Sequence, residues 1–365
     1  MAGATALLMA WYLRLTLWPP QLLAERAEER DGVRHYCSGA ALYFMGAMVW
    51  HAGSASFVAV GWAMAALVAI EAGVMLRDGI LRGHGHVMLT AALIRLVGLN
   101  LTVVDLWQGI SVRVLTVLPM IGAYAFQSAR LRRAAGLSTP FERFLARWYP
   151  WVPATLAALL VSYEAQPEFI APGWIVLAVA LLLYGVRRRI DDLRVQGYLL
   201  SVGAFGVCWA TNFNEPGWHD STMAGIAVIV LCFAAQLISL RPGAPPLTES
   251  TSVAWLDRHA RMGYALLGTA LLTALLYCEA SARALTVAWS VEAAAILVFG
   301  FVAHERALRL SGLVLLAVCI VKLFAMDFRE LDPLSRIVSF IVLGVLLVAA
   351  SWVYTRYREQ LHKYL

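Results

Sequence analysis

The chain has 365 residues, of which 61% are hydrophobic and only 14% are charged, and its formal net charge is +6. A soluble domain carries about 25% charged residues, so this composition excludes that class. The apolar stretches are close in length to the ~20 residues with which a helix crosses a membrane. The sequence therefore predicts an all-α polytopic membrane protein.

The N-terminal region, 1–33, is expected to form an interfacial segment. Its apolar stretch, residues 2–18, lacks the basic start and the small-residue cleavage site of a signal peptide. We predict a short helix that lies in the membrane interface, with Trp11, Tyr12 and Trp18 at the headgroups. A further membrane span is the alternative.

About twelve transmembrane helices are predicted after this segment. They are placed near residues 36–55, 60–76, 86–104, 111–129, 147–163, 172–186, 195–211, 221–240, 261–278, 284–303, 308–326 and 335–355. The two ends of the chain and every second loop carry 22 basic residues, against 4 in the remaining loops. Because cytoplasmic loops collect Lys and Arg, both termini are expected in the cytoplasm.

One sparse pattern occurs three times, at nearly equal intervals along the chain. It consists of Trp, then Arg twenty residues later, Gly three after that, and Asn or Asp a further fifteen along. Its copies are Trp62, Arg82, Gly85 and Asn100; Trp174, Arg194, Gly197 and Asn212; Trp289, Arg309, Gly312 and Asp327. Repeats set an architecture, so we predict three tandem four-helix units of the same orientation, at 34–133, 142–241 and 255–358.

Structure alone accounts for most of this pattern. The Trp of each copy is expected at the outer membrane interface, and the Arg at the cytoplasmic start of the third helix of its unit. The Gly is expected where the second and third helices pack closely.

Two cations within apolar helices are harder to explain as structure. Lys322 follows Arg309 by thirteen residues, and Arg95 holds the same place in the first copy, where the second copy has Val207. An intramembrane charge faces a partner or a cavity, or extends to the headgroups. We hypothesise a Lys322–Glu292 pair capped by the Trp289 ring.

In the first copy we hypothesise a cation–π contact between Arg95 and Trp62. With Asp327 and Asn100, these groups form a candidate intramembrane polar site. Extension of both cations to the headgroups remains the alternative.

No motif points to a cofactor or to a metal. Residues 212–220 offer oxygen and imidazole groups but match no known ligand spacing, so a solvated loop is expected there. His84 and His86 stand in a Gly-flanked turn, which we interpret as a flexible turn, with metal or phosphate binding as the alternative. The basic residues flank the membrane, so the expected partners are the lipid bilayer and other membrane-protein subunits, with no nucleic acid.

The end of the third unit resembles a known family. The stretch from Arg309 through Lys322 to Asp327, followed by Leu331-Asp-Pro-Leu-Ser-Arg336, is similar to the C-terminal signature of a bacterial family of large predicted multi-spanning membrane proteins of unknown function. The resemblance is clearest over residues 309–358. It implies a bacterial cytoplasmic-membrane protein and brings no catalytic residue.

Three functions are compatible with these observations. The first is transport or assembly of envelope material through an outward-facing polar site at Lys322, Glu292 and Asp327. The second is a non-catalytic scaffold or accessory subunit of a larger membrane complex. The third is a membrane-embedded transferase that uses the outer carboxylates and His219. We do not expect an enzyme.

Overall fold

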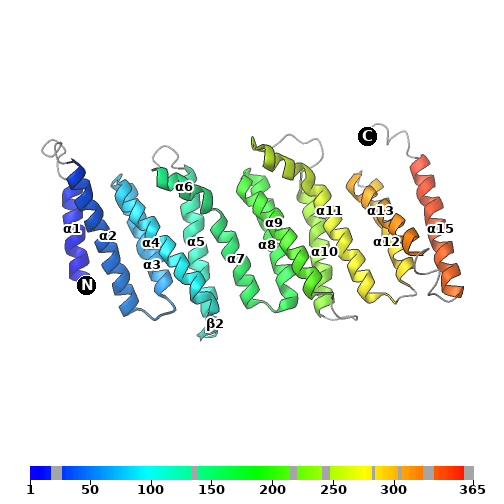
Figure 1. Cartoon of the computed structure of the whole chain (residues 1–365), viewed down its shortest axis with the longest axis horizontal. Coiled ribbons are helices and arrows are strands. Elements are labelled where there is room, and N and C mark those ends of the chain that lie inside the picture. The colour runs from blue at the N-terminus through cyan, green and yellow to red at the C-terminus, as the bar shows by residue number, and fades with distance from the viewer. Residues whose placement is uncertain are drawn as a thin grey trace. The chain divides into compact units, whose positions relative to one another are not determined.

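The computed structural model describes residues 1–17, 27–133, 139–213, 220–240, 247–281, 284–302, 306–323 and 333–356. The chain divides into two compact bodies, Met1–Tyr163 and Glu164–Leu365, and each is described by itself. Both are built of α-helices, joined in the first body by one short β-hairpin (Figure 1). The protein is an all-α membrane protein, as its composition predicts.

The first body contains α1 to α7. Its elements are α1 (Ala2–Leu17), α2 (Ala27–Ala52), α3 (Val58–Met75), α4 (Gly79–Gly98), the 3-10 turn η3 (Asn100–Thr102), β1 (Leu106–Trp107), β2 (Ile110–Ser111), α5 (Val112–Arg133), α6 (Pro140–Trp148) and α7 (Trp151–Glu164). Helix α3 packs along α4, and α1 packs along α2. Buried Ala, Leu and Met side chains of α3, α4 and α5 form the core between them.

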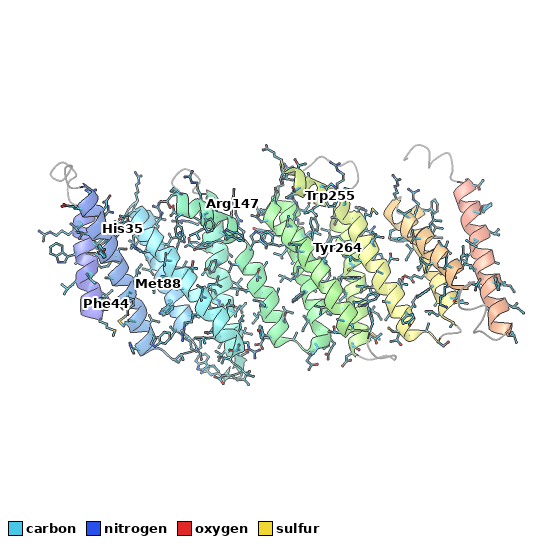
Figure 2. The ribbon with its side chains drawn as sticks, viewed as in Figure 1. His35, Phe44, Met88, Arg147, Trp255 and Tyr264 are labelled. Carbon is cyan, nitrogen blue, oxygen red and sulfur yellow. The ribbon has the colours of Figure 1, made fainter. Side chains whose placement is uncertain are left out.

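The second body contains α8 to α15. Its elements are α8 (Pro167–Arg188), α9 (Asp191–Thr211), α10 (Asp220–Ile238), α11 (Thr251–Glu279), α12 (Leu285–Val302), α13 (Arg306–Lys322) and α15 (Pro333–Arg356). Helix α8 packs along α9 and α12 along α13, while α10 contacts both α8 and α11. Figure 2 shows the side chains along these helices, among them Tyr264 on α11.

Seven stretches of the described residues are long and apolar enough to cross a membrane. They are Val58–Met75, Gly79–Thr102, Val112–Arg133, Pro140–Glu164, Pro167–Arg188, Asp220–Ile238 and Thr251–Glu279, with shorter apolar helices at Leu285–Phe301 and Phe340–Ala349. Each of the twelve predicted spans overlaps a helix of the structure. The remaining helices placed across the membrane from sequence are α2, α9 and α13.

The turns that close the first two hairpins share one geometry. Arg77 after α3 and Arg189 after α8 both have φ of 53°. In each turn the next residue donates its backbone N–H to a glycine carbonyl five residues back, Asp78 to Gly73 at 2.7 Å and Ile190 to Gly185 at 2.9 Å. This Schellman-type ending reverses the chain within three residues and sets the following helix antiparallel to the first.

The N-terminal helix departs from its prediction. Tyr12 of α1 is fully buried against the protein rather than exposed at a lipid headgroup, so that prediction is wrong for Tyr12. Trp11 is 57% exposed, and Trp18 lies outside the described residues. The two-residue strands β1 and β2 were also not predicted; they meet at Gln108 and Gly109, which both have positive φ, as a two-residue hairpin turn requires.

Candidate functional site

The Gly of each copy lies where two antiparallel helices touch. A Cβ added to Gly85 would stand 3.1 Å from the Ala66 carbonyl oxygen and 2.7 Å from the Ile70 side chain. The same position meets the carbonyl oxygen of Ala178 at Gly197, at 3.0 Å, and that of Ala293 at Gly312, at 2.9 Å. The predicted close packing of the hairpins α3–α4, α8–α9 and α12–α13 is therefore present in all three copies.

A further glycine of the pattern was missed from sequence. It stands eleven residues after the Trp and nine before the Arg, at Gly73, Gly185 and Gly300. A Cβ at these three positions would stand 2.6, 2.9 and 2.9 Å from Cγ of the paired Arg. The glycine makes room for the apolar stem of the arginine, and its constant spacing was readable in the sequence.

The Arg of the first two copies forms a buried ion pair. Arg82 donates from Nε to Glu142 Oε1 at 2.6 Å, and Arg194 donates from Nε to Asp257 Oδ1 at 3.1 Å. Arg194 is completely buried, and Asp257 is 2% exposed. A charge removed from water needs such a partner, so these pairs hold α4 to α6 and α9 to α11.

Neither carboxylate was a predicted site residue, although both occupy one position of the pattern. Glu142 stands as far before Trp174 in the sequence as Asp257 stands before Trp289. The Arg of one copy is thus bound by the first helix of the following copy. The contact recorded for Arg309 is a cation–π contact with Phe301, at 5.4 Å.

The Trp of the pattern is tied to backbone. Trp62 Nε1 donates to the Gly46 carbonyl at 2.9 Å, and Trp289 Nε1 donates to the Thr273 carbonyl at 3.1 Å. Both acceptors lie sixteen residues before the donor, on the preceding helix. These half-buried indoles therefore hold the first helix of the unit to the hairpin. This role is separate from the preference of tryptophan for the membrane interface.

The Asn of the pattern binds the loop before its hairpin. Asn100 Nδ2 donates to the Ser56 carbonyl at 2.5 Å, and Asn212 Nδ2 donates to the Glu168 carbonyl at 2.9 Å. Each acceptor lies 44 residues before its Asn, and both amides are buried. Asn100, a predicted member of the polar site, closes the hairpin in this way. The third member of the pattern, Asp327, lies outside the described residues.

Arg95 makes the predicted contact with Trp62. Its guanidinium carbon lies 5.8 Å from the Trp62 ring and 4.2 Å from the ring of Trp50, and the two indoles are 6.0 Å apart. Arg95 also donates to the Ala55 carbonyl at 3.0 Å. The cation thus covers a pair of aromatic rings rather than one, and Trp50 was not foreseen.

Lys322 covers the equivalent rings of the third copy. Its Nζ lies 6.0 Å from the Trp289 ring, which stacks on Tyr277 at 6.4 Å. Lys322 donates to the Thr286 hydroxyl at 2.8 Å. In the second copy Val207 replaces the cation and Ser162 replaces the second ring, so the sequence changes both together.

Glu292 is buried and bonded to a different residue from Lys322. Its Oε1 accepts from the Thr273 hydroxyl at 3.0 Å, and its Oε2 has no hydrogen-bond partner among the described residues. The hypothesised ion pair with Lys322 is not among the ion pairs of the described residues. The two side chains are nevertheless linked through two residues, because Glu292 bonds Thr273, Trp289 donates to the Thr273 carbonyl, and Lys322 lies over the Trp289 ring.

Cavities with aromatic walls lie in both bodies. One of about 500 Å³ between α2, α3 and α4 is lined by Trp50 and Trp62, and one of about 610 Å³ in the second body by Tyr277 and Trp289. A more polar cavity, of about 740 Å³, adjoins the first body's aromatic cavity because both are lined by His84.

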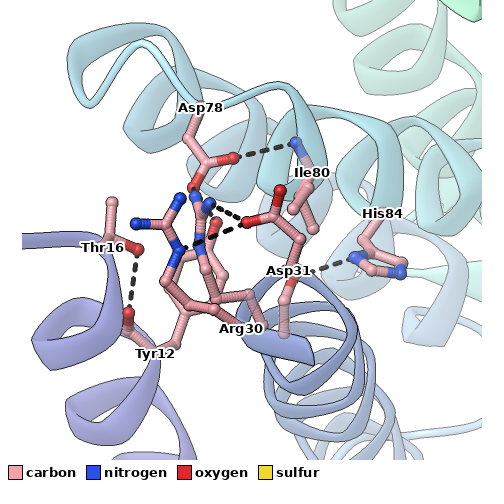
Figure 3. A network of polar contacts seen from close by, with 9 residues as sticks. Tyr12, Thr16, Arg30, Asp31, Asp78, Ile80 and His84 are labelled. Carbon is pink, nitrogen blue, oxygen red and sulfur yellow. Dashed lines mark hydrogen bonds and ion pairs between the residues drawn. The ribbon is translucent and has the colours of Figure 1, made fainter. Parts of the chain in front are cut away.

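A polar network at this last cavity was not predicted. Asp78, in the turn before α4, accepts from the Tyr12 hydroxyl, from Arg34 and from the backbone N–H of Ile80 (Figure 3). Burial alone would raise the pKa of Asp78, but these hydrogen bonds and the Arg34 charge outweigh it and hold that pKa below its ordinary value. Tyr12 and Asp78 lie far apart along the chain, which hid their contact.

Three other polar candidates each have a nearby partner, although His86 Nε2 and Glu71 Oε1 are buried without a hydrogen bond among the described residues. His84 bonds Ser38 at 2.9 Å, and His86 bonds the Tyr149 hydroxyl at 3.1 Å. Glu71, an acidic residue within α3, pairs with Arg130 at 2.8 Å. The described residues contain no group of three or more metal-ligating side chains, and His219 lies outside them.

The family comparison covers nearly the whole chain. The family described as "Predicted membrane protein (DUF2339)" matches residues 1–357. No curated protein and no solved structure is significantly similar to the chain. The match extends far beyond the C-terminal signature, over all three copies of the pattern. The chain therefore belongs to the DUF2339 family of predicted membrane proteins.

Proposed function

We propose that this protein transports envelope material, or helps to assemble it, in the bacterial cytoplasmic membrane. The material would reach a polar site formed by Lys322, Glu292 and Asp327 from the outer face. The observation that carries the proposal is the cavity of about 610 Å³ beside Thr273 and Trp289. These two residues contact Glu292 and Lys322 respectively, so a group that enters the cavity comes within one side chain of both charges.

The chemistry of Glu292 supports a working site. A buried carboxyl oxygen that lacks a hydrogen bond is costly in an apolar helix. A ligand cation, a proton or water from the cavity would supply the missing interaction. Backbone or ionic partners already hold six residues of the pattern, Trp62, Trp289, Asn100, Asn212, Arg82 and Arg194. We therefore place the exchange at Glu292 and Lys322.

Cys278 offers a direct test, because it lines the same cavity. A chain that keeps Cys278 as its only cysteine would be placed in nanodiscs of neutral phosphatidylcholine and treated with a small charged methanethiosulfonate. We expect Cys278 to react. The matched control keeps only Cys319, which is fully buried in α13, and should stay unmodified until the chain is denatured.

The contrary result is equally clear. If Cys278 reacts only after denaturation, water does not reach the cavity and the transport proposal fails. Reaction in intact cells with an impermeant reagent would show that the cavity opens outward, and reaction only in inverted vesicles would contradict the proposed direction.

A scaffold role is the second candidate, and α13 favours it. In the first two copies the Arg is clamped by an acidic residue of a following helix, whereas Arg309 rests on Phe301. The apolar side chains Leu313 and Val314 beside it are 48% and 57% exposed. This face suits a partner membrane helix that carries a carboxylate at the same depth.

Photocrosslinking tests that alternative. A crosslinker at Leu313 should give an adduct of defined size, and the Arg309→Glu substitution should abolish that adduct. Val298 of α12, which is 55% exposed, is the control and should give none. Equal crosslinking at both positions would indicate lipid-facing surfaces and exclude the partner helix.

A further inference from the structure

The two aromatic cavities occupy equivalent places in the first and third copies. The α11 residues that line the second-body cavity include Ala270, Thr273, Ala274, Tyr277 and Cys278. Each of them holds the same sequence position relative to Trp289 that a lining residue of the first-body cavity holds relative to Trp62. Together with Trp62 and Trp289 themselves, six positions of the repeat therefore line a cavity in both copies. The same cavity thus occurs in the first and the third copy.

A cation contacts the aromatic residues that line each cavity. Arg95 lies over Trp50 and Trp62, and Lys322 lies over Trp289, which stacks on Tyr277. The second copy lacks both features, because it has Ser162 and Val207 at these positions. Ring and cation are thus present together or replaced together, as expected of parts that serve one ligand.

The chemistry of the walls defines that ligand. Both cavities are predominantly apolar, and their volumes fall in the ~300–1,000 Å³ range of ligand sites. Trp and Tyr belong at the level of lipid headgroups, with the hydrocarbon chains beyond them. A guanidinium or an ammonium group at that level attracts phosphate. An apolar hollow with aromatic rings and a cation at its edge therefore matches an acyl chain that ends in an anionic headgroup.

Arg95 keeps a donor for such a headgroup. It donates through Nη2 to the Ala55 carbonyl, while its buried Nε has no partner among the described residues. A cation within a membrane is unfavourable without a partner, so a bound phosphate would offset part of that cost.

We infer that the first and third copies each bind one anionic glycerophospholipid, with an acyl chain in the cavity and the phosphate on Arg95 or Lys322. This inference rests on the proposed function and names the class of its substrate. The second copy, which lacks the ring and the cation, binds none.

Native mass spectrometry of the purified chain with dioleoyl-phosphatidylglycerol tests the count. The wild-type chain should retain two lipid molecules. Arg95→Gln and Lys322→Gln should each retain one, and the double variant should retain none. Arg188→Gln is the matched control, because Arg188 also covers an aromatic ring at 5.8 Å, but that ring belongs to Tyr184, which lines neither aromatic cavity. It should retain both lipids.

A second variant separates loss of binding from loss of folding. Ala47 lines the first-body cavity and does not contact Arg95 by any recorded bond, so Ala47→Phe should fill the hollow and remove one lipid. Its melting temperature and that of Arg95→Gln report whether the fold persists. An unchanged count of two in the double variant, with the fold intact, would overturn the inference.

The choice of probe distinguishes the sources of binding. Dioleoylglycerol, which has no phosphate, should be lost in the spectrometer; if two molecules are retained, the cations are not headgroup ligands. Inorganic phosphate should not displace the lipid, and displacement would indicate a phosphate site instead.

The cysteine experiment keeps this inference apart from the proposed function. In phosphatidylcholine nanodiscs Cys278 should react, and added dioleoyl-phosphatidylglycerol should slow the reaction several-fold. Reaction without protection by the lipid contradicts the inference and leaves the proposed function standing. Absence of reaction in both cases contradicts the proposed function, whatever the lipid count.

Discussion

At the scale of single residues, most polar groups of the pattern join neighbouring helices or loops through hydrogen bonds and ion pairs. Trp62 and Asn100 donate to backbone carbonyls of neighbouring segments, and Arg82 binds a carboxylate of the next copy. In a membrane the alternative partner for such a group is not water but hydrocarbon, so each unsatisfied group costs several kcal/mol. A few polar side chains therefore position long apolar helices.

Removal of one member of a buried pair should be costly. Arg82→Met leaves Glu142 buried and unpaired, which is expected to cost about 3–5 kcal/mol of stability. The double variant with Glu142→Gln should lose less than the sum of the two single variants. Thermal melting in detergent measures all four chains, and Arg132→Met on α5 is the exposed control. Additive losses would show that the two side chains do not interact.

Asp78 should make the first body sensitive to acid. Because its pKa in the folded protein lies below the ordinary value of ~3.9, it stabilises the fold fully above that value. This contribution is lost as the pH falls through the lower, folded-state pKa. The melting temperatures of wild type and Asp78→Asn should differ most near pH 7 and converge as the pH falls below about 4. A constant difference would show that the Asp78 charge does not contribute.

At the scale of elements, the antiparallel hairpin is the recurring device. Each one closes over glycines that allow the backbone of one helix to touch the other, and two are reversed by an Arg in the left-handed region. Two helices in lipid gain no hydrophobic driving force for association, as they would in water. Van der Waals packing drives their association instead, and it requires the two backbones to approach closely.

Glycine-to-alanine substitutions should distinguish the glycines at helix contacts from the glycines that face open space. Gly85→Ala places a Cβ against Ala66 and Ile70 and should destabilise the first body by about 1–3 kcal/mol. Gly122→Ala in α5 meets no atom within 4 Å and should be neutral or stabilise by ~0.5–1 kcal/mol. Comparison of the melting temperatures checks both. A loss at Gly122 equal to that at Gly85 would contradict the role of helix contact.

Helices and the contacts within one hairpin are predicted well from the sequence, because they depend on periodicity and on spacings between residues that are near one another in the chain. Helix positions, the Gly85 contact and the Arg95–Trp62 contact all follow from distances along one hairpin. Glu142 and Asp257 were missed because each lies in the copy after its arginine, 60 and 63 residues away. Tyr12 and Asp78 were missed because nothing in α1 resembles the later units, and the hairpin at Gln108 follows from φ values that only a structure gives.

At the scale of the whole molecule, the pattern links each copy to the next. Arg82 of the first is held by Glu142 of the second, and Arg194 of the second by Asp257 of the third. We propose from this that three four-helix units of the same orientation form the chain. A common orientation would place the arginine and its carboxylate at the same depth in the two copies whose ion pairs are seen.

That orientation has a simple test. With native cysteines replaced, Gln108→Cys in the β-hairpin should react with an impermeant maleimide added to intact cells. Arg132→Cys at the end of α5 should react only after permeabilisation, because the positive-inside rule places it in the cytoplasm. The opposite result would invert the proposed topology and place both termini outside.

The ion pairs also impose an order on biosynthesis. Glu142, the partner of Arg82, is added to the growing chain sixty residues after Arg82. At about 5–20 residues per second this gap lasts about 3–12 s. Throughout that interval the guanidinium must stay hydrated at the membrane surface, because burial without Glu142 is unfavourable. The hairpins that carry Arg82 and Arg194 can therefore bury these arginines only after α6 and α11, which carry their carboxylates, have been made.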